Sequence, residues 1–270
     1  RKLYDLIVSD GEDLAVRELY EEFKNLPLFQ NDLGYFHKDN IPIITDSVYG
    51  NANITSINID VIREMLEGFR NIFFPGYFGR DINDLITTLG SNGSDTTAIA
   101  LSAALRALCV IIKDTGAIYT ADPKVILDAL ALNEVNLSQA NILASLGSKI
   151  IHEKGAAYAE QAQLDIIVRA IDGQKETLIS PKSPKLKFAG VTKRKVAASA
   201  NHKLVKATKI SVVGSNIGSK IAYEILSKEG YDIIHTQTPY NDEASSVIIK
   251  TEDKSLIKSA MIALHNSLAS

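Results

Sequence analysis

The 270-residue sequence has little cysteine and no excess of basic residues. Its single cysteine, Cys109, lies in an apolar run, so we expect a buried small hydrophobic side chain and no intrachain disulfide. The net charge of −3 argues against nucleic acid as the main partner, because no surplus of lysine and arginine is available to neutralise phosphates. No apolar run approaches membrane-spanning length and no signal peptide opens the chain. These absences predict a cytoplasmic protein without a membrane partner, or one inside an organelle after removal of a transit peptide.

What is present is ordinary for a globular protein. Hydrophobic residues make up 46% of the chain and charged residues 23%. The length allows one large domain or two modest ones, each with its own core. The first residue is Arg1 rather than Met, and the chain opens inside a helical pattern, which predicts that an N-terminal piece is missing.

A glycine-flanked loop is the most informative feature of the chain. Gly90 and Gly93 bracket small polar residues, where the backbone can approach a ligand closely. Ser94 and Asp95 then occupy predicted N-cap positions before a helix expected over residues 97–108. Loop amides and a helix N-terminus together favour anions, so we expect an anion site here.

A second polar loop follows the apolar run at residues 109–112. It carries two lysines and two aspartates, which are Lys113, Asp114, Asp122 and Lys124. Since both polar loops follow core elements, the sequence predicts one site with the ligand lying between them.

The remaining segments alternate between helical and extended patterns up to residue 170, which favours a largely parallel sheet. We expect helices at residues 3–23 with a break at 9–12, and at 57–69, 125–132, 138–146, 156–162, 219–228 and 254–268. We expect strands at 42–46, 71–79, 109–112, 165–170, 209–213, 231–236 and 246–250, and the strand at 71–79 should leave the sheet through a glycine turn. The Pro/Ser/Lys-rich segment 180–184 is the best candidate for a domain boundary. Beyond it, the β-α-β-β-α order is that of a ferredoxin-like domain.

Three motifs in this order resemble those of the aspartate kinases of the amino-acid kinase family. They are Thr87-Thr88-Leu89-Gly90, then Gly93-Ser94-Asp95, then Tyr119-Thr120-Ala121-Asp122-Pro123. The resemblance implies an α/β fold in which a mostly parallel sheet is sandwiched by helices. It implies a catalytic domain over residues 1–185, lacking its N-terminal strand, and an ACT-type regulatory domain over 186–270.

The resemblance also assigns roles in binding aspartate. Glu12 holds the amino group of the substrate, although an acidic turn explains the Asp10–Asp13 run equally simply. Tyr77 takes the position of an aromatic residue that lines the amino-acid pocket, with core packing as the alternative. Gly93 and Ser94 complete the substrate site. Asp95 organises the catalytic centre, and an N-cap role is compatible with that.

ATP with Mg²⁺ is the implied cofactor. The residues that would hold the nucleotide are Lys113, Asp114, Tyr119, Thr120, Ala121, Asp122, Pro123, Lys124 and Lys149. A solvated surface lysine is the alternative for Lys149, and a structural role is the simpler interpretation of His152. Most members of the family have Arg where Lys124 stands, so the charge is kept but the bidentate geometry is lost.

The resemblance implies phosphorylation of L-aspartate on its β-carboxylate, with feedback by an amino acid, lysine or threonine, and a homodimer or higher oligomer through ACT units. Three departures matter. The glycine-rich first strand and its phosphate-contacting Lys are absent, and Ser91 replaces an Arg that clamps a substrate carboxylate at the catalytic centre. Only residues 191–270 follow Gly190, so the first of two expected ACT units is truncated, which we attribute to lost segments. These departures leave a catalytically weak regulatory subunit open, and a glutamate kinase or other relative is a further alternative.

Overall fold

The computed structural model describes most of the chain, namely residues 1–29, 31–114, 116–148, 151, 153–200, 203–218, 220–240 and 242–269. The chain divides into two compact units, Arg1–Ala107 and Leu108–Ser270. This division lies well before the predicted boundary at 185/186, which stays a prediction. Residues beyond 107 belong with the C-terminal sheet because they bond to it: the N–H of Val191 donates to the carbonyl of Thr120 at 2.8 Å.

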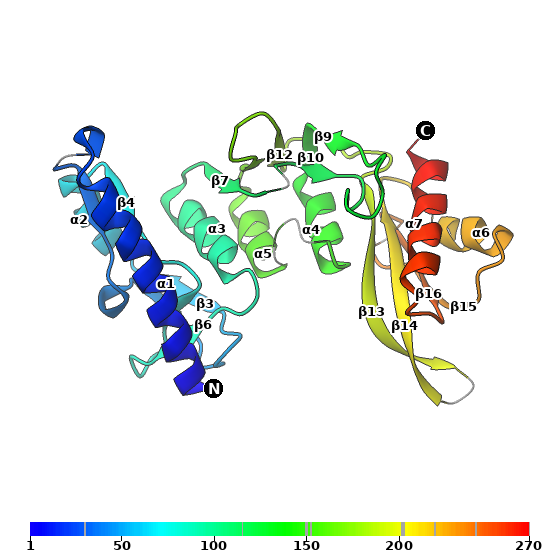
Figure 1. The fold of residues 1–270 in the computed structure, drawn as a ribbon, viewed down its shortest axis with the longest axis horizontal. Helices are drawn as coiled ribbons and strands as arrows, with labels where there is room; N and C mark the ends of the chain where they lie inside the picture. Colours follow the sequence, from blue (N-terminus) through cyan, green and yellow to red (C-terminus); the bar gives the residue numbers. More distant parts are fainter. Residues whose placement is uncertain are drawn as a thin grey trace. The chain divides into compact units, whose positions relative to one another are not determined.

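The first unit combines helices with short strands (Figure 1). Its elements are α1 (Lys2–Phe23), η1 (Pro27–Phe29), β1 (Leu33–Tyr35), η2 (Lys38–Asn40), β2 (Ile43–Thr45), β3 (Ile54–Ile57), α2 (Ile59–Gly68), β4 (Asn71–Phe73), β5 (Phe78–Arg80), β6 (Ile86–Thr88) and α3 (Gly93–Leu105). One sheet has the order β3-β2-β5-β6 and another pairs β1 with β4. Only the β2–β5 pair of the larger sheet is parallel, so the expectation of a mostly parallel sheet is wrong here.

Helix α1 is continuous, and the predicted break at residues 9–12 is wrong. The helix packs against β6, β1 and β4 through a polar stripe: Asp5, Ser9 and Asp13 are buried at a spacing of four residues. Residues four apart share one helix face. Asp5 and Asp13 use this face to bind other segments, whereas the Ser9 hydroxyl donates to the carbonyl of Leu6 in the same helix at 2.8 Å. The helix continues through Gly11. This residue faces open space, because a Cβ there would meet no heavy atom within 4 Å.

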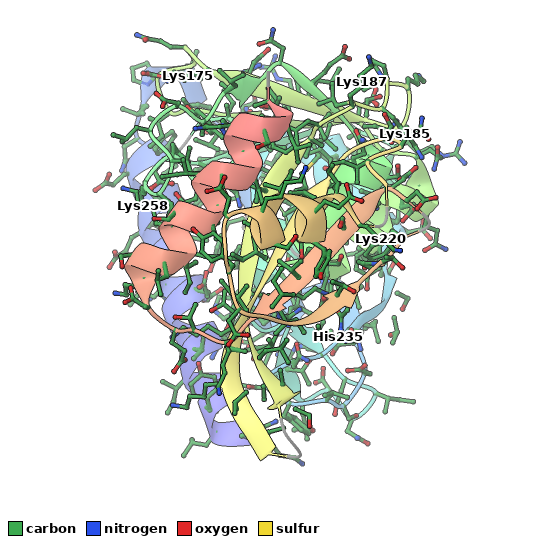
Figure 2. All side chains as sticks on the ribbon, turned by 90° about the vertical axis from the view of Figure 1, so that its right-hand side faces the viewer. Lys175, Lys185, Lys187, Lys220, His235 and Lys258 are labelled. Carbon is green, nitrogen blue, oxygen red and sulfur yellow. The ribbon has the colours of Figure 1, made fainter. Side chains whose placement is uncertain are left out.

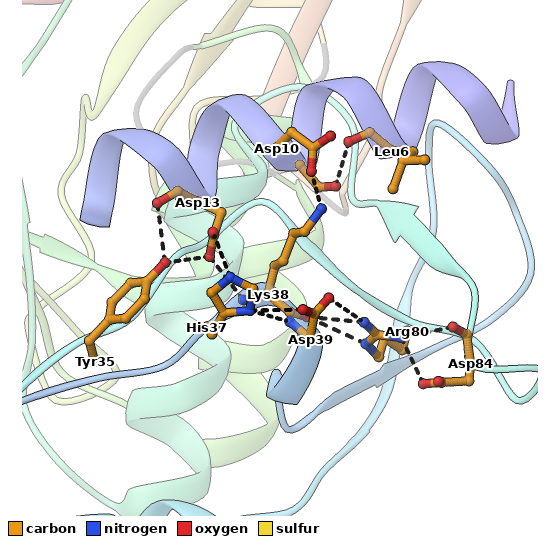
Figure 3. Close-up of polar contacts among 10 residues, drawn as sticks. Leu6, Asp10, Asp13, Tyr35, His37, Lys38, Asp39, Arg80 and Asp84 are labelled. Atoms are coloured by element: carbon orange, nitrogen blue, oxygen red, sulfur yellow. Dashed lines mark hydrogen bonds and ion pairs between the residues drawn. The ribbon is translucent and has the colours of Figure 1, made fainter. Parts of the chain in front are cut away.

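Asp13 joins α1 to the end of β1 and to the segment that follows it (Figure 3). Its carboxylate accepts hydrogen bonds from the Tyr35 hydroxyl at 2.5 Å and from the N–H of Lys38 at 2.9 Å. Burial, and then the hydrogen bond and charge of Asp13, raise the pKa of Tyr35. One turn earlier, Asp10 forms an ion pair with the side chain of Lys38. Polar contacts therefore hold this part of α1 against the rest of the unit.

The second unit begins with a mixed sheet and ends with an antiparallel one. Its elements are β7 (Cys109–Ile112), β8 (Ile118–Tyr119), β9 (Ala131–Leu132), β10 (Glu134–Asn136), α4 (Leu137–Ser145), α5 (Glu153–Ala162), β11 (Ile166–Arg169), β12 (Glu176–Ser180), β13 (Gly190–Ala200), β14 (Lys203–Val213), α6 (Ile221–Lys228), β15 (Ile233–Gln237), β16 (Ala244–Ile249) and α7 (Lys254–Leu268). In the sheet β10-β12-β11-β7 the middle pair is antiparallel. The helix predicted over 125–132 is wrong: turns lead to β9 there, because the Thr120 hydroxyl accepts the N–H of Leu130.

The C-terminal sheet has the order β13-β14-β16-β15, and all its neighbouring strands are antiparallel. Helices α6 and α7 cover one of its faces (Figure 1), where Ile210, Val247, Leu226 and Leu264 form a buried core. The order β14-α6-β15-β16-α7 is the predicted β-α-β-β-α order. Where a truncated unit was expected, β13 and β14 pair residue for residue as one hairpin. Within the described residues, no helix is long and apolar enough to cross a membrane.

Candidate active site

The turn between β6 and α3 has the backbone geometry that its glycines permit. Gly90 has φ of +84°, and a Cβ there would lie 2.8 Å from Oδ1 of Asn51. The N-cap of α3 is Asn92, in the left-handed region, so the predicted N-cap positions of Ser94 and Asp95 are wrong. Both belong to the first turn of the helix, and the side chain of Asn92 makes no capping bond. The carboxylate of Asp95 therefore lies near the positive end of the helix dipole.

Tyr77 is held against the start of α3. Its N–H donates to Oγ1 of Thr97 at 3.1 Å, and its carbonyl accepts from Leu89 at 2.8 Å. Its φ of +79° is an unusual backbone state for a tyrosine, which the surrounding contacts must maintain. A Cβ on Gly93 would lie 2.8 Å from Cδ2 of Tyr77. Only a glycine leaves room for the ring at this position.

The backbone at the neighbouring Gly76 lies close to the first turn of α3, since a Cβ there would be 3.2 Å from Cα of Ser94. Three of the residues predicted to bind the substrate, Tyr77, Gly93 and Ser94, are therefore brought together. Ser91 lies in the preceding turn with an exposed side chain.

Glu12 reaches the same region from α1. Burial raises the pKa of its carboxyl group. The pKa of Tyr77 is also raised, chiefly by burial and then by the nearby Tyr4, Glu12 and Asp5. Within the described residues Glu12 forms no ion pair with a lysine or arginine. A half-buried carboxylate without a cationic partner can accept a bound ammonium group, and that matches the predicted role.

Asp5 is a residue of this region that the sequence reasoning missed. Its carboxylate is fully buried and accepts hydrogen bonds from the N–H of Gly50 at 2.9 Å and of Thr88 at 3.1 Å. It also accepts the Thr88 hydroxyl at 2.9 Å. Asp5, Ser9 and Asp13 are spaced four residues apart, and this spacing is visible in the sequence. Nothing in the neighbouring sequence identifies Gly50 and Thr88 as the partners of Asp5.

The second polar loop belongs to the other unit. Lys113 and Asp114 directly follow β7; Lys113 is half-buried and Asp114 is exposed. The carboxylate of Asp122 accepts the N–H of Lys124 at 2.9 Å, and this turn leaves both side chains exposed around Pro123. Charged groups are therefore presented to solvent from two turns of the unit.

Tyr119 has a cationic neighbour that the sequence reasoning also missed. Nζ of Lys175 donates to the Tyr119 hydroxyl at 3.2 Å and lies 5.7 Å from the ring centroid. Lys175 is among the basic side chains labelled in Figure 2.

Thr120 and Ala121 have packing roles in the structure. The Thr120 hydroxyl bonds Nε2 of His265 at 2.8 Å and accepts the N–H of Leu130 at 2.9 Å. Ala121 is 5% exposed and belongs to the core under α6 and α7. The predicted nucleotide contacts of these two side chains are therefore not supported, because both side chains are committed to the interior. Lys149 and His152 lie outside the described residues.

The two predicted loops belong to different units, so their meeting over one ligand stays a prediction. The part of the chain that the structure describes contains no group of three or more His, Cys, Asp and Glu side chains arranged to hold a metal ion. A cavity of about 610 Å³ opens in the first unit between η2, α2 and the β5–β6 turn. None of the predicted site residues lines it. Arg80 at its wall is already bonded to Asp84 and to the carbonyl of Lys38 (Figure 3).

Comparison with known proteins places the chain in a family. Residues 2–170 match the model of the amino acid kinase family. The chain is 35% identical over 167 residues to the aspartokinase of Thermus thermophilus, covering 62% of this chain and 40% of that protein. It is 36% identical over 143 residues to aspartokinase 2 of Bacillus subtilis, covering 52% of this chain and 35% of that protein. The chain thus spans less than half the length of these curated relatives.

Solved structures share the fold. The structure of E. coli aspartokinase III in complex with aspartate and ADP matches with a TM-score of 0.82 at 16% identity, over 100% of this chain and 76% of that chain. Its complex with lysine and aspartate matches with a TM-score of 0.70 at 17% identity. The family match covers the helix that carries Glu12, the glycine-flanked turn at Gly93 and the second polar loop. From these matches we conclude that the chain belongs to the amino acid kinase family.

Proposed function

We propose that the chain is part of an aspartate kinase, which transfers the γ-phosphoryl group of ATP to the β-carboxylate of L-aspartate. The observation that carries this proposal is the gathering of Glu12, Tyr77, Gly93 and Ser94 at the start of α3. They lie within residues 2–170, which match the amino acid kinase family, and the chain is about one residue in three identical to aspartokinases over its matched part. The product, aspartyl phosphate, would enter the synthesis of lysine, threonine and methionine.

The reaction brings an anion against an anion. Two unit charges 4 Å apart repel by about 4 kcal/mol at an effective dielectric constant of 20. A site for this reaction therefore needs oriented N–H groups and cations more than a base, because the aspartate carboxylate is already ionised at neutral pH. The first turn of α3 begins at Gly93 without a side-chain cap, so its N–H groups can supply part of this field.

In the transfer, an oxygen of the β-carboxylate bonds to the γ-phosphorus, and ADP leaves with the electron pair of the broken P–O bond. Glu12 would pair with the substrate ammonium group, and Tyr77 would close the pocket beside it. Asp95 would orient the reacting groups from the first helical turn. Ser91 occupies the place of a carboxylate-binding Arg, which would weaken this site but leave its other contacts.

ATP would be held by the second polar loop, through Lys113, Asp114, Tyr119, Asp122 and Lys124. Mg²⁺ usually binds in such sites through nucleotide phosphates and one or two carboxylates. The exposed carboxylates of Asp114 and Asp122 fit that requirement. Bound Mg²⁺ would neutralise charge on the transferring phosphate.

The C-terminal sheet with α6 and α7 would be an ACT-type regulatory domain. Its β-α-β-β-α order supports this assignment. We propose an amino-acid effector, lysine or threonine, and a homodimer or higher oligomer formed through these domains.

The test is trapping of the acyl phosphate. The complete protein is incubated with ATP, MgCl₂, hydroxylamine and L-aspartate, and the hydroxamate is measured against samples that lack ATP or contain L-glutamate. We expect hydroxamate only with aspartate and ATP. Product with glutamate alone would indicate a glutamate kinase, and no aspartate-dependent product would refute the proposal.

A further inference from the structure

The β13–β14 hairpin is strongly basic. Residues 190–213 contain five lysines and one arginine but no Asp or Glu. The strand register divides these residues between the two faces of the sheet. Val191, Ile210 and Val212 belong to the core under α6 and α7, so the residues that alternate with them lie on the opposite face.

A polar row crosses all four strands on this opposite face. Thr192 pairs with Ser211, Ser211 with Ser246, and Ser246 with Gln237. The first three are at most 6% exposed. Oγ of Ser211 lies 2.7 Å from Oγ of Ser246. One O–H serves that contact, so the second O–H of the pair remains available to another acceptor.

Two cations stand opposite each other next to this row. Arg194 and Lys209 are direct partners on the same face of the hairpin. Like charges directly opposite each other destabilise a sheet. Burial, and then the charge of Arg194, lower the pKa of Lys209. The pair is thus unfavourable unless something negative lies between its members.

Neither cation has a carboxylate partner among the described residues. Nζ of Lys209 donates to Oε1 of Gln237 at 2.8 Å, and Nη1 of Arg194 donates to the carbonyl of Ser145 at 3.3 Å. These bonds use one donor of each group and leave the others. Elsewhere in this unit, by contrast, Lys185 (labelled in Figure 2) forms an ion pair with Glu243.

We propose that this face of the sheet binds a small oxyanion, a phosphate or carboxylate group, between Arg194 and Lys209. The buried Ser211–Ser246 pair lies in the next row on the same face. Arg194 is exposed, so the anion reaches the half-buried Lys209 from solvent. The site offers many donors and few acceptors, and that imbalance selects an anion over a neutral ligand. The inference does not depend on the proposed kinase activity.

The test measures thermal stability of the full chain in sodium phosphate, sodium succinate and sodium chloride at equal ionic strength. We expect a larger rise in melting temperature with phosphate or succinate than with chloride. The two arms distinguish a phosphate from a carboxylate ligand. In K209Q and in R194Q the apparent affinity for the effective anion should fall about tenfold or more.

Lys206 and Lys195 provide matched controls, because their register places them on the side of the hairpin that α6 and α7 cover, opposite Arg194 and Lys209. K206Q and K195Q should keep the full response. The same samples are also tested for a rise in melting temperature with ADP. That rise reports on the proposed nucleotide site, so it can fail without affecting the anion response, and the anion response can fail without affecting it. Equal responses to all three salts in the unchanged protein would overturn the inference. A rise in melting temperature with phosphate or succinate that is undiminished in R194Q or K209Q would also overturn it. If one of these variants does not fold, the other is sufficient for the test.

Discussion

The buried carboxylate of Asp5 binds Thr88 twice, through its backbone N–H at 3.1 Å and its hydroxyl at 2.9 Å, although 83 residues separate them in the chain. Thr88 ends β6, two residues before Gly90. The first turns of α1 therefore fix the strand end from which the glycine-flanked turn departs. This contact gives Asp5 a structural role at the end of β6.

Replacing Asp5 with Ala should destabilise the protein by about 3 kcal/mol, because buried donors of Thr88 and Gly50 lose a charged acceptor. Urea unfolding would measure this loss. Asp10→Asn is the control, since it removes only an ion pair with Lys38 at a largely exposed carboxylate and should cost about 1 kcal/mol or less. Equal losses in the two variants would contradict the role of Asp5.

Gly93→Ala should reduce kinase activity strongly, because the added methyl group would lie 2.8 Å from Cδ2 and 3.2 Å from the Cα of Tyr77. The ring and the backbone at Tyr77 must then shift, which we expect to cost on the order of 100-fold in kcat/KM. Gly11→Ala is the matched control on α1, where no heavy atom lies within 4 Å. It should stabilise the helix by about 0.5–1 kcal/mol and leave activity intact. An active Gly93→Ala enzyme would show that close packing at this turn is unnecessary.

Glu12→Gln should raise the KM for aspartate by roughly 10- to 100-fold, because a charge-assisted bond to the substrate ammonium is lost. The free energy of unfolding at pH 7, in contrast, should increase in this variant. The raised pKa of Glu12 means that its charged form is disfavoured in the folded state, so stability falls as pH rises through that pKa, and the neutral variant escapes this loss at pH 7. Kinetics and urea unfolding measure the two effects. Glu18→Gln, an exposed change on the same helix, should alter neither.

The hydrogen bonds of Asp81 should make the stability of the protein sensitive to acid. Burial alone would raise its pKa, but hydrogen bonds from Leu85, Ser47, Tyr49 and Asn83 outweigh burial and lower the pKa to about 2. The stability that Asp81 contributes is fully present above its unfolded pKa near 4 and is lost as pH falls toward 2. Unfolding curves between pH 6 and 2 should therefore fall less steeply for Asp81→Asn than for the unchanged protein. Identical slopes would show that these bonds do not favour the charged carboxylate.

Ser91→Arg should increase kcat/KM for aspartate about 10- to 100-fold by adding a charge-assisted contact to a substrate carboxylate. Steady-state kinetics with ATP held saturating would measure the change. Ser91→Gln controls for side-chain length, and should leave activity near that of the unchanged protein. If Arg gives no more than Gln, then Ser91 does not occupy the carboxylate-binding position.

Elements with strong local signals were predictable from the sequence. Helix α7 has the expected bounds, Lys254–Leu268, because Asp253 caps it by accepting the N–H groups of Ser255 and Leu256. Strand β7 also has the expected bounds, since an apolar β-branched run allows little else. The glycines at 90 and 93 do mark a tight turn, because a Cβ at either position would lie 2.8 Å from a neighbouring side chain of the protein; close approach to a ligand there stays a prediction.

Features that depend on distant contacts were not predictable. Helix α1 runs through the acidic, glycine-containing segment because Asp5 and Asp13 find partners in β6 and beyond β1, and no local pattern encodes those partners. Residues 125–132 have helical composition, but the Thr120 hydroxyl captures the N–H of Leu130. The inward roles of Thr120 and Ala121 likewise follow from the helix and sheet that cover them.

Thr120 is bonded in three directions: to Leu130 across the loop, to the N–H of Val191 in β13, and to His265 in α7. The loop proposed to hold the nucleotide is thus anchored to the same strand and helix that build the C-terminal sheet. Such a junction leaves the loop no hinge of its own. Whatever loosens the end of α7 or the start of β13 must also release the segment from Tyr119 to Lys124, and whatever stiffens that segment must tighten the sheet.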